Sequence, residues 1–254
     1  MTRWIGLALH HLRYVNLSYW RNPGAAFFGV FFPLMLLTIN SLVFGATRVN
    51  IHGTPVTVAT FYVAGMAVFA VVMTCFTGLA ISVLFDRDTG RLKRIRATPT
   101  PVSAYIGARL MFAILLGLLT SLLCLGESVA FFHVSITTPE LLAFVVTIAV
   151  GSASLAALSL AVVSLVANAQ AGPAVLNAMT FPVLFLSSVF YPIEGLPGWL
   201  NTLAGLLPIR PLAKAATGAV FGAGIEFQSL AIVLAWGVAG ALIASRNFRW
   251  QPRR

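Results

Sequence analysis

Charged side chains that could bind a partner or take part in a reaction are concentrated in one short segment. Seven of the 22 Asp, Glu, Lys and Arg residues lie within eleven positions, from Asp86 to Arg96, and long apolar stretches flank them on both sides. Each Lys or Arg costs roughly 2.5 to 3.5 kcal/mol at the centre of a bilayer, so this segment must lie in water. Its chemistry is ionic. It can anchor the membrane topology of the chain, or it can dock a partner that carries carboxylates.

Other reactive groups are sparse. The chain has no G-x-x-x-x-G-K-[ST] phosphate loop, no H-E-x-x-H metal pattern and no G-x-S-x-G serine motif, so we expect it to hydrolyse no ATP and to bind no metal or cofactor itself. Glu127 is the one carboxylate well inside an apolar stretch. It could relay protons, or it could be a polar contact near the outer end of its span.

Some aromatic and Met side chains in apolar stretches could line a path for a hydrophobic substrate, although each could equally face lipid. The candidates are Phe69, Met73, Phe76, Phe181 and Phe185.

Composition places the chain in a membrane. Hydrophobic residues make up 59% and charged residues 9%, and the mean hydropathy is +0.94, whereas soluble proteins average about 25% charged residues. The net charge of +10 does not indicate nucleic-acid binding, because the basic residues cluster in short segments beside apolar stretches, as membrane topology requires. The two cysteines, Cys75 and Cys124, lie in apolar stretches and indicate nothing about redox compartment.

The apolar pattern predicts an all-α, polytopic membrane domain over residues 1–254. About 20 apolar residues cross the hydrocarbon core, and six spans are expected, at 25–44, 59–85, 105–132, 141–167, 174–191 and 227–245. The uncharged stretch 141–193 is long enough for two spans, and the Asn-Ala-Gln-Ala-Gly-Pro sequence at 168–173 divides it. Residues 1–22 predict an amphipathic helix on the membrane surface. Residues 192–226 predict two short interfacial or re-entrant helices, the second starting near Pro211.

Basic residues also predict the orientation. Thirteen of the 16 Lys and Arg residues fall on the side that holds both termini and the charged segment, if Arg109 at the start of the third span is included. The positive-inside rule therefore places both termini and the charged segment in the cytoplasm.

Several motifs occur in an order that resembles ABC-2 type permeases, especially the daunorubicin-resistance exporter subunits, over nearly the whole chain. They are Trp-Arg-Asn-Pro at 20–23, Val-Phe-Gly at 43–45, Asp-Arg-Asp-Thr-Gly-Arg-Leu-Lys-Arg-Ile-Arg-Ala-Thr-Pro at 86–99, and Ser-Ser-Val-Phe-Tyr-Pro followed by Leu-Pro-Gly-Trp-Leu within 187–200.

The resemblance implies half of a transporter. Two permeases would pair, as identical copies or close paralogues, and two separate cytoplasmic ATPase subunits, which hold ATP and Mg, would dock on the coupling element at 86–101. The residues implied for docking are Arg87, Asp88, Gly90, Arg91, Arg94, Thr98 and Pro99. The expected function is export of amphipathic drugs or lipid-like molecules across a bacterial plasma membrane. A permease for lipid-linked polysaccharide and a self-contained secondary transporter are the alternatives.

The coupling element has an expected shape. Gly90 interrupts a continuous charged helix and the prolines at 99 and 101 end it, so residues 91–96 should form a short, stiff helix. Arg91 and Arg94 should share one face and pair with carboxylates of the ATPase. Leu92 and Ile95 should fill an apolar groove on that partner.

Overall fold

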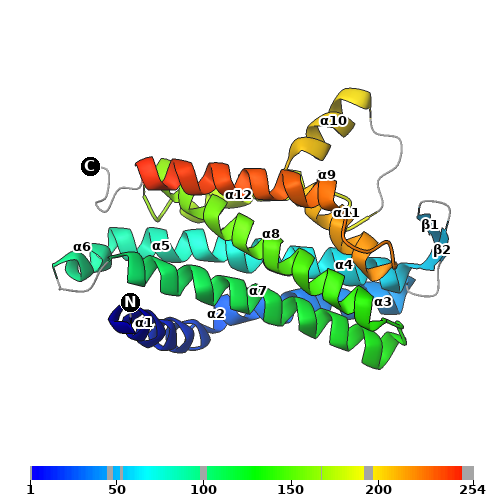
Figure 1. The fold of residues 1–254 in the computed structure, drawn as a ribbon, viewed down its shortest axis with the longest axis horizontal. Coiled ribbons are helices and arrows are strands. Elements are labelled where there is room, and N and C mark those ends of the chain that lie inside the picture. Colours follow the sequence, from blue (N-terminus) through cyan, green and yellow to red (C-terminus); the bar gives the residue numbers. More distant parts are fainter. Residues whose placement is uncertain are drawn as a thin grey trace.

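The computed structural model describes residues 2–44, 48–51, 54–97, 102–166, 168–191 and 197–247, and these residues are almost entirely helical. Figure 1 shows the long helices lying side by side along one axis. The first half of the chain contains α1 (Thr2–Trp20), α2 (Pro23–Ala26), η1 (Phe27–Phe31), α3 (Phe32–Phe44), β1 (Arg48–Ile51), β2 (Thr54–Thr57), α4 (Val58–Val71), η2 (Val72–Gly78), α5 (Leu79–Asp88) and α6 (Arg91–Arg96). The second half contains α7 (Val102–Phe132), α8 (Thr138–Leu165), α9 (Gly172–Leu186), α10 (Gly198–Leu206), α11 (Ile209–Val220) and α12 (Phe227–Asn247).

Among the described residues, five continuous helices are long and apolar enough to cross a membrane. They are Pro23–Phe44, Val58–Asp88, Ser103–Phe132, Thr138–Leu165 and Phe227–Asn247. Where a fifth of six spans was expected, at 174–191, the structure has the 15-residue α9. At 1.5 Å per residue α9 is about 22 Å long, less than the roughly 30 Å of a bilayer core. The helix ends at Leu186, and Ser188 has a positive φ of 54°.

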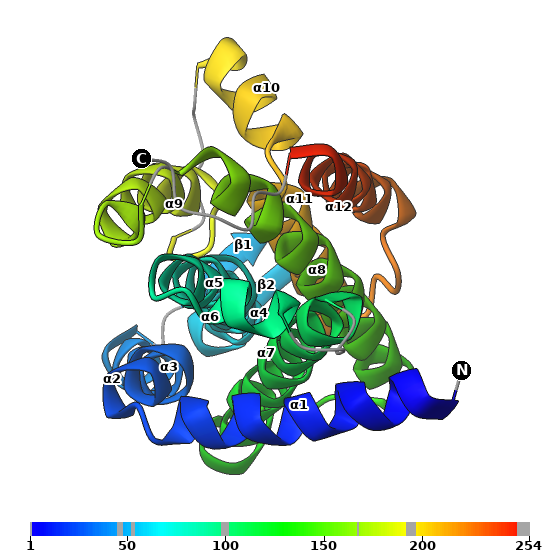
Figure 2. The same ribbon diagram turned by 90° about the vertical axis from the view of Figure 1, so that its left-hand side faces the viewer.

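The second long helix, α4–η2–α5, forms the centre of the bundle. Seen from the α6 end in Figure 2, it is surrounded by α3, α7, α8 and α9, with which it is in contact. Every residue of α4 except Thr60 is buried. Its middle turn, η2, is a π-helix, and such turns occur mostly as short insertions in α-helices, often at functional sites. The sequence carries no signal that predicts this turn.

Small residues bring α8 and α12 together. A Cβ added to Gly240 of α12 would lie 2.6 Å from the Leu158 Cα of α8, and one added to Gly237 would lie 2.8 Å from the Ser154 Cα. Helices approach this closely where small residues line the contact, and in lipid such packing supplies much of the association energy.

The amphipathic α1 lies across the α6 end of the bundle (Figure 2), where the described C-terminal end of α12 also lies (Figure 1). Tyr19 fixes its connection to the first long helix, because its hydroxyl donates to the Ala25 carbonyl at 2.9 Å and fills the space beside Gly29. Burial raises the pKa of Tyr19 to about 12, so this hydroxyl keeps its proton.

The opposite end carries shorter elements (Figure 1). The connection at 48–57 contains the antiparallel hairpin β1–β2, in which Arg48 pairs with Thr57. Two short helices follow α9, and the second begins at Ile209, two residues before Pro211, near which its start was expected. Pro211 is therefore in the first turn of α11, where a missing N–H costs no helical hydrogen bond.

Candidate coupling site at the α6 end

A tight turn converts the end of the central helix into α6. The Thr89 hydroxyl donates to the Phe85 carbonyl at 2.7 Å and so satisfies one of the last carbonyl groups of α5. Gly90 then takes the left-handed conformation, with φ 72°, which residues with a Cβ rarely adopt. The turn allows α6 to follow α5 directly, so a force on α6 acts on the central helix of the bundle.

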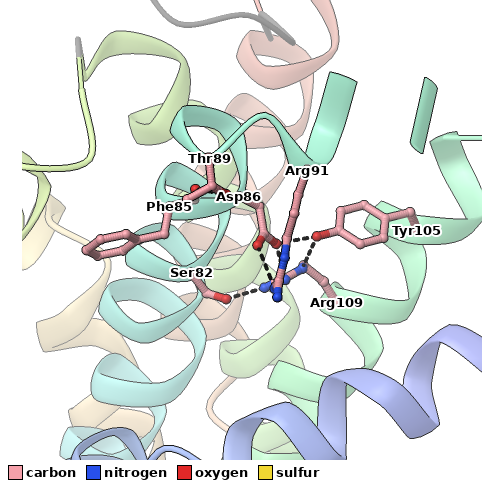
Figure 3. A network of polar contacts seen from close by, with 7 residues as sticks. All are labelled: Ser82, Phe85, Asp86, Thr89, Arg91, Tyr105 and Arg109. Atoms are coloured by element: carbon pink, nitrogen blue, oxygen red, sulfur yellow. Dashed lines mark hydrogen bonds and ion pairs between the residues drawn. The ribbon is translucent and has the colours of Figure 1, made fainter. Parts of the chain in front are cut away.

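Asp86 lies at the centre of a buried ionic network beneath this turn (Figure 3). Its exposed fraction is 4%, and its carboxylate accepts hydrogen bonds from the Tyr105 hydroxyl and from Nη2 of Arg109, both on α7. Arg109 also donates through Nε to the Tyr105 hydroxyl at 2.7 Å and through Nη1 to the Ser82 hydroxyl. Arg91 Nη1 of α6 donates to the second oxygen of Asp86 at 3.3 Å. One carboxylate thus joins α5, α6 and α7.

Arg87 and Asp88 form a second link, to the connection between α8 and α9. Arg87 is 2% exposed, and its Nη1 and Nη2 donate to the carbonyls of Val163 and Val166 at 3.1 and 2.9 Å. These carbonyls lie at the C-terminal end of α8, where a cation interacts favourably with the helix dipole. Asp88 accepts a hydrogen bond from the Ala169 backbone N–H at 2.5 Å. These hydrogen bonds join the end of α5 to the α8–α9 connection.

The outer surface of α6 is basic. The side chain of Arg91 is 63% exposed despite its ion pair, and Lys93 and Arg94 are exposed as well. Leu92 differs from expectation: it is 1% exposed, so it packs inside this chain and cannot fill a groove on a partner. The two remaining candidates for docking, Thr98 and Pro99, lie outside the described residues.

Arg87 requires a similar correction. The expectation treated it as part of a solvent-exposed docking segment, but its guanidinium group points into the bundle. The physical reason is that the last carbonyl groups of α8 have no partner within the helix, so they can accept hydrogen bonds from a buried cation.

The sequence pattern did not mark Ser82, Asp86, Tyr105 or Arg109 as candidate site residues. The spacing of Tyr105 and Arg109, one helical turn apart beside a charged segment, is the signal that could have found them.

Glu127 connects two long helices away from this site. Its carboxylate accepts a hydrogen bond from the Thr38 hydroxyl of α3, and its Oε2 has no hydrogen-bond partner among the described residues. The residue is partly buried on α7. This geometry matches a polar contact between α3 and α7.

We expect Glu127→Gln to reduce transport less than threefold, because glutamine retains an oxygen that accepts the Thr38 hydrogen bond. Transport by reconstituted vesicles and the thermal stability of the purified chain are the measurements, with Thr38→Val as the matched loss of the same hydrogen bond. Complete loss of transport in a stably assembled Glu127→Gln complex would mean that proton relay is essential.

The candidate path residues form a buried group and an exposed pair, which meet at Phe190: the ring centroids of Phe185 and Phe190 are 5.5 Å apart. Phe69 is 1% exposed and packs against Phe32 and Phe190 in the core, with ring centroids 5.9 and 5.4 Å away. Phe76 is also buried and Met73 is partly buried against the same core. Phe181 and Phe185 are exposed on α9, at 42% and 62%. Within one chain Phe69 and Phe76 therefore serve as core residues, and the α9 pair faces outward.

The structure is a bundle of long apolar helices in which the short basic helix α6 follows directly from the central helix, and the buried Asp86 is paired with Arg91 of α6 and Arg109 of α7. The profile of the ABC-2 type transporter family matches residues 10–221. The chain belongs to the ABC-2 type transporter family.

Two curated relatives agree with this assignment. The "Putative transport permease ycf38" of Porphyra purpurea is 24% identical over 225 residues, which cover 87% of this chain and 76% of that protein. The protein of the same name from Pyropia yezoensis is 23% identical over 225 residues, which again cover 87% of this chain and 76% of that protein. The chain is thus a transport permease of the ABC-2 family, the membrane component and not the catalytic domain, and membership implies an ABC ATPase as its partner.

Proposed function

We propose that this chain is the permease subunit of an ABC exporter that moves amphipathic drugs or lipid-like molecules outward. A separate ATPase, in two copies that hold ATP and Mg, docks on the basic surface of α6. The observation that carries this proposal is the ionic link between that surface and the bundle. Arg91 is exposed on α6 and also bonds to Asp86, which is buried and bonds to Arg109 of α7.

This arrangement supports mechanical coupling. Nucleotide-driven closure of the ATPase would displace α6, and because α6 follows α5 through a two-residue turn, the displacement would act on the central helix. The Asp86 network would pass it to α7, and Arg87 and Asp88 would pass it to the end of α8 and the start of α9. The buried pair of Asp86 and Arg109 would hold α5 to α7 during this movement, because an uncompensated buried charge costs about 3 to 5 kcal/mol.

The membrane arrangement follows from the same proposal. The α6 end lies in the cytoplasm of a bacterial cell, because the basic residues concentrate there. The chain crosses the plasma membrane six times, with α9 and residues 187–191 forming the fifth crossing. The hairpin, α10 and α11 lie on the outer side, and both termini are cytoplasmic.

Two permeases would form the path. Phe181 and Phe185 of α9 are exposed together with Phe28 and Phe31 of η1. A second copy, identical or a close paralogue, could cover such apolar side chains and complete a lining for a hydrophobic substrate. The lining would be aromatic and aliphatic, which favours amphipathic molecules over glycans.

Purification through a tagged ATPase tests this assembly. We expect the intact complex to have the mass of two permeases and two ATPases, and to move a fluorescent amphipathic drug into inverted vesicles when ATP is supplied. An ATPase variant that cannot hydrolyse ATP is the control for the energy source. A single permease that transports without any ATPase would exclude the proposal.

A further inference from the structure

A pocket with several polar lining residues is formed by α10, α11 and α12. Figure 1 shows α10 and α11 toward the end of the bundle opposite α6. Its volume is about 260 Å³. Each of the three helices contributes polar side chains to its lining, namely Asn201, Arg210, Lys214, Gln228 and Ser229. Three separate helices therefore place hydrogen-bonding groups around one space.

The pocket carries an excess of positive charge. Lys214 forms an ion pair with Glu226, whose second oxygen accepts a hydrogen bond from the Ser229 hydroxyl at 3.0 Å. Arg210 Nη1 donates to the Asn201 carbonyl at 3.1 Å, and no carboxylate among the described residues lies within ion-pair distance of it. A guanidinium group has five N–H donors in a planar fork, which suits the oxygens of a phosphate group.

Apolar residues complete the lining of the pocket, namely Gly205, Pro211 and Ile232. Leu206 of α10, next to Gly205, is 58% exposed. Trp236 of α12 donates its Nε1–H to the Leu206 carbonyl at 2.7 Å, which ties α10 to α12. Tryptophans with a polar contact and a partly exposed ring are typical of the level where lipid headgroups meet acyl chains.

We propose that this pocket binds an anionic phospholipid from the leaflet at this end of the bundle. Arg210 would hold the phosphate diester, Asn201 and Gln228 would bond its remaining polar groups, and the acyl chains would cover Ile232, Leu206 and Trp236. A net anionic lipid is favoured over a zwitterionic one, because a choline group would bring a second cation near Arg210 and Lys214. The inference does not depend on the ATPase or on export.

Native mass spectrometry of the full chain in detergent micelles tests it, with phosphatidylglycerol and phosphatidylcholine added in turn. We expect the wild-type chain to retain one phosphatidylglycerol in preference to phosphatidylcholine. Arg210→Gln should weaken this retention about tenfold, as loss of a charge-assisted hydrogen-bond donor predicts. Arg246→Gln, which removes an exposed cation in the last turn of α12, is the matched control and should leave retention unchanged.

Glu226→Gln should change the retention of phosphatidylglycerol in the opposite direction to Arg210→Gln. It releases Lys214 from its ion pair and removes a negative charge beside the pocket, so retention of phosphatidylglycerol should rise severalfold. If Glu226 and Lys214 serve only to pin α11 to α12, this variant lowers thermal stability and leaves lipid retention unchanged, which overturns the proposal. If the Arg210→Gln chain fails to insert into the membrane, the Glu226→Gln result alone still tests the proposed lipid site.

A competition experiment separates a lipid from a soluble anion. Displacement of the lipid by an equal concentration of glycerol phosphate would identify a site for a soluble anion and would also overturn the proposal.

Discussion

Replacing Arg91 and Arg94 together with Glu is expected to abolish ATP-driven export while the chain still inserts and folds. Both side chains are on the exposed surface of α6, where a partner's carboxylates can reach them. Charge reversal converts two attractive contacts into repulsive ones, and juxtaposed like charges at an interface cost several kcal/mol. Folding should change little, because the side chain at position 91 is 63% exposed: loss of its pair with Asp86 costs about 1 kcal/mol or less, and a glutamate there can turn into water, away from Asp86.

Hydrolysis and transport should be measured side by side in reconstituted vesicles. We expect drug efflux to fall at least tenfold, and ATP hydrolysis to lose its stimulation by the permease. The matched control reverses two other exposed arginines, Arg21 and Arg246, and should export normally. Normal efflux by the Arg91 and Arg94 double variant would show that the charged segment only anchors the topology.

The second large effect is expected at Asp86. Asp86→Ala removes the carboxylate that faces Arg109, which is 9% exposed, and leaves that cation buried without its counter-ion. Removing one member of a buried ion pair destabilises proteins by about 3 to 5 kcal/mol. Unfolding of the purified chain in mixed micelles, titrated with dodecyl sulfate, measures the free energy of unfolding.

A double-mutant cycle separates the pair from the rest of the network. Adding Arg109→Leu to Asp86→Ala should recover part of the lost stability, because the unpaired charge is gone. Asp86→Asn should cost less than Asp86→Ala, since the amide oxygen can still accept the Tyr105 hydrogen bond. A cost below about 1 kcal/mol for Asp86→Ala would mean that Arg109 finds another partner or water.

The sequence predicted the long apolar helices well, because length and hydropathy almost determine a membrane span. It placed α9 less well: hydropathy continues to Tyr191, but the helix ends at Leu186, and nothing in apolar composition marks that point. The hairpin at Arg48–Ile51 and Thr54–Thr57 was missed because a short polar connection between spans has no required structure.

The sequence located the charged segment that forms the site, but it did not show which side chains of that segment are buried and which are exposed. Arg87 and Arg91 look equivalent in the sequence, yet one is buried at the end of α8 and the other is exposed on α6. What separates them is the position of the Val163 and Val166 carbonyls, which tertiary packing brings to Arg87 from more than 70 positions away. Likewise, Asp86 was counted as a solvated charge, because its pairing with Arg109 depends on how α5 and α7 pack.

Site-specific photocross-linking tests the central claim that α6 is the surface through which an ATPase drives this permease. A photoreactive amino acid at Lys93, which is exposed on α6, is compared with one at Thr202, which is exposed on α10 toward the other end of the molecule. In membranes that export actively, we predict a cross-linked product of permease plus ATPase from position 93 and none from position 202. An exporting complex that gives no such product from position 93, or gives it equally from position 202, would contradict the account.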